Sequence, residues 1–359
     1  MKKTLFAIGA MVAMVACSND FVVKEAAQEA IGFENMFVDN STRSVVDPSF
    51  SNSNMFDKFH VYGYVEGAPL FDSANTGVVV TKNGNAWTYP SEQTQYWIAG
   101  ADYNFNAVAP ATGWTKKVAT DATDVTDATQ TTLSFTNNGI TDLLYATAIA
   151  EGKVAGQNND VAFTFRHTLS KVKFSFENAY DATNSTIRVK DIKIMDAYKT
   201  GDVVLMAATA TTPTAWSNQA KADGFVLDFG MATDDQATDA KENVEVAFAC
   251  DETYESQNEL FMIPGAGATD VTVTNANGTP TEYNDVYTVQ FTVELLVNGQ
   301  YITEYDHTIY TNFVPEPGKS YDLKAVIDPA TIDPSTSQDS IQFTVTEIKG
   351  WDNQAEQNI

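Results

Sequence analysis

The sequence predicts an all-β protein made of two tandem β-sandwich domains. Thr, Val, Phe and Tyr, which favour strands, are abundant. Apolar and polar residues alternate over short segments that are separated by polar turns. No stretch keeps a helical apolar stripe for more than about two turns. A length of 359 residues suggests about two domains, and 43% hydrophobic residues can supply a sizeable core.

The first 17 residues have the features of an export signal. Lys2 and Lys3 precede a short apolar run that ends at Cys17, an arrangement typical of a secretory signal. The run is shorter than the ~20 residues that a membrane-spanning helix needs. Its end, Met14-Val15-Ala16-Cys17, resembles a bacterial lipobox. We therefore expect residues 1–16 to be a lipoprotein signal peptide and Cys17 to carry lipid. An ordinary secretory signal with an incidental Cys remains the alternative.

The next segment combines a strand with an exposed loop. Residues 17–43 are expected to form a lipidated propeptide that contains a first strand at 30–38, with Ile31 and Phe33 on one face. Residues 39–54 are rich in Asn, Ser and Thr, a composition typical of an exposed connection.

Alternation predicts the strands of both domains, which we place at 44–159 and 160–328. The expected strands share short runs of alternating apolar residues and lie at 59–65, 78–80, 161–165, 172–176, 187–194, 203–206, 225–229, 244–249, 260–263, 271–273, 287–297, 301–310 and 321–327. Asn83-Gly84-Asn85 and Asn298-Gly299 are hairpin signals, since Asn and Gly tolerate positive φ. Residues 119–130 read as an acidic loop.

The C-terminus is organised differently. Residues 329–359 begin with a Pro/Ser/Thr-rich linker, after which Ile341, Phe343 and Val345 alternate with polar residues. This pattern predicts one amphipathic strand joined to the second domain by a flexible connection. It is either available to another molecule or folded back into its own domain.

Charge and residue types exclude several functions. The formal net charge of −26 argues against nucleic-acid binding, which depends on Lys and Arg. His60, His167 and His307 are far apart in the sequence, and Cys250 ends an expected strand, where it reads as a core residue. No catalytic or nucleotide-binding motif is present. We therefore expect no enzymatic activity, no cofactor and no metal site.

Five segments together resemble the fimbrillin-type pilins and fimbrillin-like lipoproteins of the Bacteroidota. They are the signal ending at Cys17, the run 163–172 (FTFRHTLSKV), the run 260–264 (LFMIP), the run 317–323 (PGKSYDL) and the terminal strand leading to Trp351. The resemblance implies two β-sandwich domains of transthyretin-like, Greek-key type. It also implies a lipidated precursor at the outer membrane and cell surface.

In pilus-forming members of that family, a protease cuts in the loop after the first strand. Arg43-Ser44 is the matching bond here. Lys24 is a competing basic site, but it precedes the strand, so cutting there does not remove it. Loss of the first strand opens a groove that a strand from a neighbouring subunit fills. Ile341, Phe343 and Val345 have the alternation that such a donor strand requires.

The sequence therefore predicts a subunit or accessory adhesin of a cell-surface fimbria. Its partners are other pilin subunits, in a homo- or heteropolymer, and the outer membrane through the lipid on Cys17. The ligand on a host or bacterial surface is not specified. The alternative is a monomeric surface lipoprotein that binds glycans through aromatic residues such as Trp87, Trp97 or Trp114.

Overall fold

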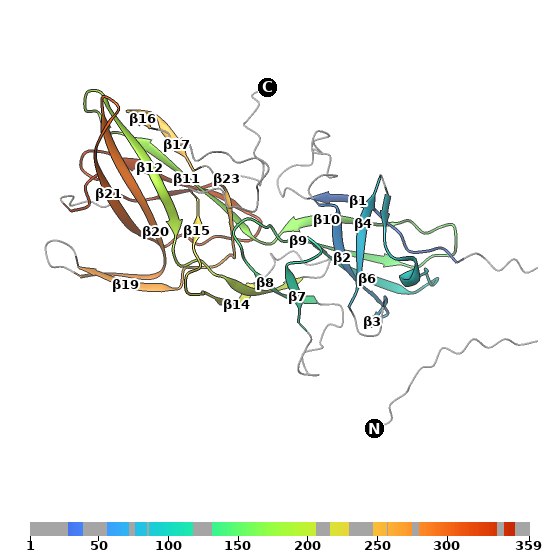
Figure 1. Ribbon diagram of the computed structural model, residues 1–359. Coiled ribbons are helices and arrows are strands. Elements are labelled where there is room, and N and C mark those ends of the chain that lie inside the picture. Colours follow the sequence, from blue (N-terminus) through green and yellow to red (C-terminus); the bar gives the residue numbers. More distant parts are fainter. Residues whose placement is uncertain are drawn as a thin grey trace, which may run out of the picture.

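The structure is a computed structural model that describes residues 28–38, 56–71, 76–84, 86–117, 131–205, 216–229, 247–256, 258–274, 280–335 and 341–348. These residues form strands and one short 3₁₀ helix, Ser91–Gln93, and include no α-helix. The predicted all-β class is thus confirmed. The molecule is elongated, with the strands of the N-terminal half gathered at one end and those of the C-terminal half at the other (Figure 1).

The N-terminal strands form one sheet that closes on itself. Its members are β1 (Phe33–Val38), β2 (Lys58–Val65), β3 (Ala68–Pro69), β4 (Val78–Asn83), β5 (Ala86–Thr88), β6 (Asp102–Ala109), β9 (Leu144–Glu151) and β10 (Val161–His167). Their order is β3-β2-β4-β5-β1-β10-β9-β6, and β6 pairs back onto β2. Because this sheet closes on itself, it is a barrel in place of the predicted N-terminal sandwich. A closed sheet buries its apolar face in its own interior.

Strand β1 completes this barrel. It pairs with β10 in parallel, whereas the other pairs of the barrel are antiparallel. Its contact with β5 is a single antiparallel register position, Phe33 opposite Trp87. Without β1, the barrel has a gap between β5 and β10.

The C-terminal strands form the predicted sandwich. One sheet contains β11 (Ser170–Asn178), β17 (Thr253–Glu255), β18 (Leu260–Met262), β22 (Ser320–Ile327) and β23 (Thr344–Ile348). The other contains β12 (Ser185–Ile194), β15 (Leu227–Asp228), β16 (Phe248–Ala249), β19 (Thr269–Thr274), β20 (Pro280–Val297) and β21 (Gln300–Thr311). Their inner faces share one core, in which Phe176 of β11 meets Phe291 of β20 at 5.0 Å between ring centroids.

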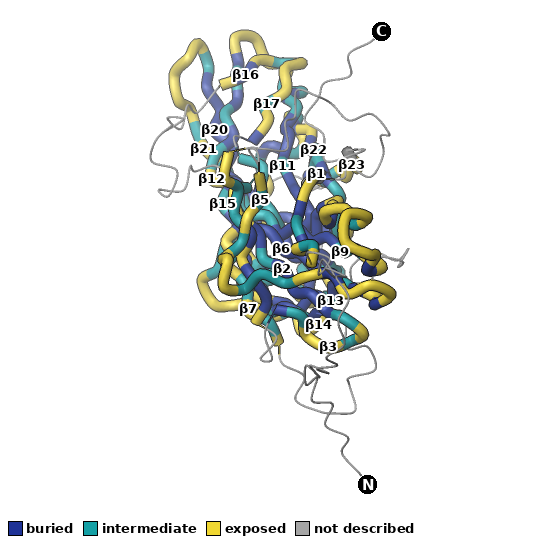
Figure 2. The backbone as a smooth tube through the Cα atoms, turned by 90° about the vertical axis from the view of Figure 1, so that its right-hand side faces the viewer, coloured by how far each residue is buried: buried dark blue, intermediate teal, exposed yellow. Residues whose placement is uncertain are grey.

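A fourth sheet joins the two halves of the chain. It has the order β14-β13-β8-β7 and contains β7 (Trp114–Lys116), β8 (Thr131–Thr136), β13 (Thr200–Leu205) and β14 (Trp216–Ala220). Its apolar residues, including Leu133 and Val203, pack against Val108 and Tyr145 of the barrel. In Figure 2, which looks along the long axis from the barrel end, buried residues are dark blue and include most of β6 and β13.

A buried carboxylate holds this fourth sheet together. Asp202 is 5% exposed and accepts hydrogen bonds from Lys117, Ser134 and Asn218. Burial pushes the pKa of Asp202 upward, but the three donors outweigh it and keep that pKa below its ordinary value. The side chain is therefore an ionised cross-strand anchor.

Most expected strands coincide with observed ones, and the Asn298-Gly299 turn has the expected positive φ at both residues. Eight of the described strands lie where alternation marked none, namely β3, β5, β6, β7, β8, β9, β14 and β17. The boundary placed at 159/160 also separates strands that the structure pairs. Strand β10 belongs to the barrel, and β8 of the first half pairs with β13 of the second.

Candidate functional site: the positions of the first and last strands

The position of β1 is built around one phenylalanine. Phe33 is 3% exposed. Its ring stacks on Phe163 at 5.8 Å between centroids and meets Phe59, Tyr89 and Phe105 edge-on at 6.3, 5.6 and 6.1 Å. We call the space that β1 fills between β5 and β10, with these four rings as its lining, the β1 slot.

Hydrogen bonds to the backbone fix the residues that enter the β1 slot. The Ile31 amide donates to the Gln95 carbonyl at 2.9 Å, and the Tyr89 hydroxyl donates to the Ile31 carbonyl at 2.8 Å. Burial raises the pKa of Tyr89, so its hydroxyl remains a donor. The Val161 amide donates to the Gly32 carbonyl at 2.8 Å. Residues 31–33 are therefore held on both sides.

Gly32 marks a tight point of the β1 slot. A Cβ added there would lie 2.2 Å from Oδ1 of Asp160. Asp160 is exposed, so its side chain can turn away when a larger residue arrives. The position of Gly32 can therefore accept a residue with a side chain.

The last described strand occupies the edge of a sheet. Strand β23 pairs with β22 in antiparallel register, with Val345 opposite Leu323. Ile341 is 1% exposed, and the partly buried Phe343 meets Phe174, Phe176 and Phe291 at 5.3, 6.1 and 6.0 Å. Val345, by contrast, is 39% exposed. The predicted amphipathic strand therefore lies in its own domain here, with its third apolar residue only partly covered.

The linker before this strand is anchored by a histidine. His307 is 3% exposed, stacks on Phe291 at 5.0 Å and contacts the Ile332 carbonyl through Nε2 at 3.1 Å. Burial lowers the pKa of His307, against opposing effects of the Ile332 carbonyl, Asp306 and Asp333. The neutral ring is the form that this site favours.

The other residues predicted for processing lie outside the described part of the chain. These are Cys17, Arg43 and Ser44. Lipidation and cleavage at these positions remain predictions.

The tryptophans named for glycan binding belong to packed regions. Trp97 is 7% exposed and meets Tyr103 edge-on at 4.8 Å, and Trp87 packs against Phe59 at 5.0 Å. The Trp114 indole donates to the Pro110 carbonyl at 2.9 Å. Each is explained by packing or by a turn contact.

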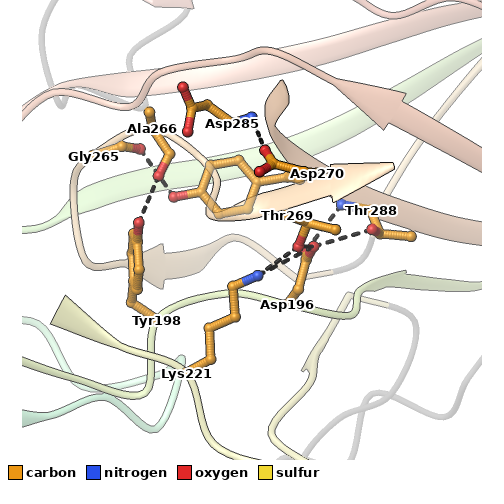
Figure 3. A network of polar contacts seen from close by, with 10 residues as sticks. Asp196, Tyr198, Lys221, Gly265, Ala266, Thr269, Asp270, Asp285 and Thr288 are labelled. Carbon is orange, nitrogen blue, oxygen red and sulfur yellow. Dashed lines mark hydrogen bonds and ion pairs between the residues drawn. The ribbon is translucent and has the colours of Figure 1, made fainter. Parts of the chain in front are cut away.

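Polar clusters in the described residues have structural roles. In Figure 3, Asp196 accepts a hydrogen bond from the Thr269 hydroxyl, and the Tyr198 hydroxyl donates to the Ala266 carbonyl of the adjacent turn. The Tyr287 hydroxyl donates to the Gly265 carbonyl of the same turn at 2.9 Å. These bonds fix that turn against β20. His167 contacts Asp142 at 2.5 Å at the junction of barrel and sandwich.

Within the described residues, no cluster of His, Cys, Asp and Glu side chains is suited to hold a metal ion. None of their helical segments is long and apolar enough to span a membrane.

These features define an all-β protein whose first and last described strands each supply apolar side chains to a larger core. The chain belongs to the fimbrillin-like family, which matches its residues 42–351. No curated protein matches the chain.

Three solved structures are similar in outline. The fimbrial anchor protein Mfa2 from Porphyromonas gingivalis is 13% identical and has a TM-score of 0.39, covering 89% of this chain and 97% of its own. A candidate cell adhesion protein of Bacteroides eggerthii is 16% identical with a TM-score of 0.43, covering 89% and 95%. Another, from Bacteroides ovatus, is 13% identical with a TM-score of 0.43, covering 92% and 100%.

Proposed function

We propose that this chain is a structural subunit or accessory adhesin of a cell-surface fimbria, matured by proteolysis and assembled by strand exchange. Membership of the fimbrillin-like family supports a fimbrial or adhesive role at the cell surface and a structural, non-enzymatic protein. The precursor reaches the outer membrane as a lipoprotein anchored through Cys17. Its partners are further pilin subunits.

The observation that carries the proposal is the placement of β1. It fills a gap in an otherwise continuous barrel, and the connection from β1 to β2 contains Arg43. Cleavage after Arg43 makes β1 a separate fragment that only packing and hydrogen bonds retain. Removing it exposes unpaired backbone groups beside an aromatic groove, a surface that readily accepts another strand.

Strand exchange requires that the incoming strand bury about as much apolar surface as β1 does. Burying Ile31 and Phe33 contributes roughly 1.5–3 kcal/mol each. A replacement strand therefore has to supply comparable apolar side chains. The segment 341–348 offers Ile341, Phe343 and Val345, and among the described strands its strand β23 lies at a sheet edge beside β22.

The test uses the unlipidated precursor beginning at Ser18. Limited trypsin treatment should produce a new N-terminus at Ser44, and the cut protein should form ladders on a gel run without boiling. Arg43→Gln should prevent both, because any remaining cut at Lys24 leaves β1 attached. Lys24→Gln is the matched control and should assemble normally.

Two results would contradict the proposal. One is a cut protein that remains monomeric after β1 has been displaced. The other is unchanged assembly of Ile341→Asp, since a carboxylate cannot be buried in an apolar groove without a large cost.

A further inference from the structure

The β1 segment and the C-terminal segment carry the same short pattern. Residues 31–33 read Ile-Gly-Phe and residues 341–343 read Ile-Gln-Phe. Ile31 and Ile341 are each 1% exposed. Phe33 meets four aromatic rings in the barrel, and Phe343 meets three in the sandwich. Two distant segments therefore pack the same pair of side chains, at the same spacing, against aromatic rings, with Phe33 buried and Phe343 partly buried.

We propose that the C-terminal segment of a second copy enters the β1 slot in the direction of β1, with Ile341 at the position of Ile31 and Phe343 at that of Phe33. This inference rests on the proposed strand exchange and specifies its register. The donor strand then runs parallel to β10. Phe343 lies opposite Val161, where Phe33 lies in the precursor.

The proposed register also fixes the position of Val345, the third apolar residue of the donor segment. Strand β1 has an irregularity between Glu34 and Phe37 that adds a residue relative to β10. The segment 341–345 alternates without interruption, so a regular pairing brings Val345 opposite the fully buried Phe163. Val345 is 39% exposed in its own domain. The β1 slot thus covers an apolar side chain that the resting position leaves partly open.

Other registers fit less well. A shift by one residue turns all three apolar side chains outward. A shift by two residues places Val345 in the pocket of Phe33 and leaves it underfilled, which creates a cavity.

The tight point at Gly32 favours the parallel direction. In that direction Gln342 meets Asp160, whereas the reversed strand brings the β-branched Thr344 to the same place. Gln is unbranched at Cβ and crowds this point less than Thr. Asp160→Ala removes the side chain that crowds the Gly32 position, so it should strengthen binding of a peptide spanning 339–348 severalfold. Phe343→Ala in that peptide should weaken binding by about 100-fold.

Disulfide trapping tests the register directly. In a Cys250→Ser background, single-cysteine variants are cleaved, mixed and oxidised, so that a disulfide can form only between copies. The register places Thr344 of one copy opposite Ala162 of another, both exposed residues. T344C with A162C should form a cross-linked dimer. T346C with A162C should give at least tenfold less, since two residues along a strand add about 6.6 Å, beyond disulfide reach.

The outcomes separate the two proposals. Preferential cross-linking of Q342C with A162C indicates a reversed donor, and preferential cross-linking of T346C with A162C indicates a shift by two residues. Either result, in protein that forms ladders, overturns the register and leaves strand exchange standing. Absence of ladders after cleavage and displacement of β1 overturns both.

Discussion

Replacing Phe33 by Ala tests whether β1 is an integral part of the barrel. The substitution removes a ring that is 3% exposed and that contacts four other rings. The neighbours belong to β2, β6, β10 and the segment after β5, so they cannot all move to fill the space. We expect a cavity in the centre of the barrel.

The cost follows from the size of the deleted group. Truncation of a buried Phe to Ala costs about 3–5 kcal/mol, and the upper end applies where the surroundings cannot collapse. For a domain of this size, each kcal/mol lowers the melting temperature by about 2–4 °C. The precursor barrel should therefore melt roughly 6–20 °C lower.

The measurement is urea unfolding of the unlipidated precursor, followed by tryptophan fluorescence and by hydrogen exchange of β2, β6 and β10. Hydrogen exchange of these strands reports the unfolding of the barrel separately from that of the sandwich, because the two transitions need not coincide. Glu34→Ala is the matched control, because Glu34 is an exposed residue of the same strand; it should change stability by less than about 0.5 kcal/mol. A loss below about 1 kcal/mol for Phe33→Ala would refute the reasoning, since the β1 slot would then not depend on its central ring.

Three further changes have expected outcomes. Asp202→Asn should lower the urea midpoint at pH 7 and flatten the loss of stability in acid; the depressed pKa of Asp202 makes its contribution present above about pH 4 and lost below. His307 has a lowered pKa, so docking of the linker at 328–335 should be full above about pH 6.5 and weaken below it. Faster hydrogen exchange of the linker at pH 5 should report this weakening, and His307→Gln should remove the pH dependence. Gly77→Ala should cost at least about 1–2 kcal/mol in urea unfolding, because φ is +71° and a Cβ would lie 2.4 Å from the Val61 carbonyl oxygen. Gly84→Ala has a similar φ of +62° without that contact and should cost less.

The sequence predicted elements whose side chains alternate strictly. Strand β10 is buried at every second residue, so local alternation alone located it. The same holds for Ile341 and Phe343, which face the sandwich core as their spacing predicted. Period 2 is a local property and needs no knowledge of the partner strand.

Strands β6 and β9 were missed because burial does not follow hydrophobicity there. Strand β6 buries Asn106, which donates to the Thr131 hydroxyl at 3.1 Å, and β9 has alanines where larger residues would have signalled a strand. The pairing of β1 with β10 joins residues more than 120 positions apart. No local pattern encodes such a register, so the closed barrel and the β1 slot could not be predicted from the sequence.

The direct passage from β10 into β11 has a mechanical consequence. Only Thr168 and Leu169 separate these strands, and β11 pairs with β22 in parallel over eight register positions. In a fibre built by the proposed strand exchange, tension on a donated strand in the β1 slot would pass to β10, along the covalent chain to β11, and through the β11–β22 ladder to the linker of the segment that this subunit donates. Bonds in such a ladder are pulled in shear, so they share the force instead of breaking one after another. The fourth sheet and the outer strands are not part of this path of force, so a pulled subunit can keep its connection while they deform.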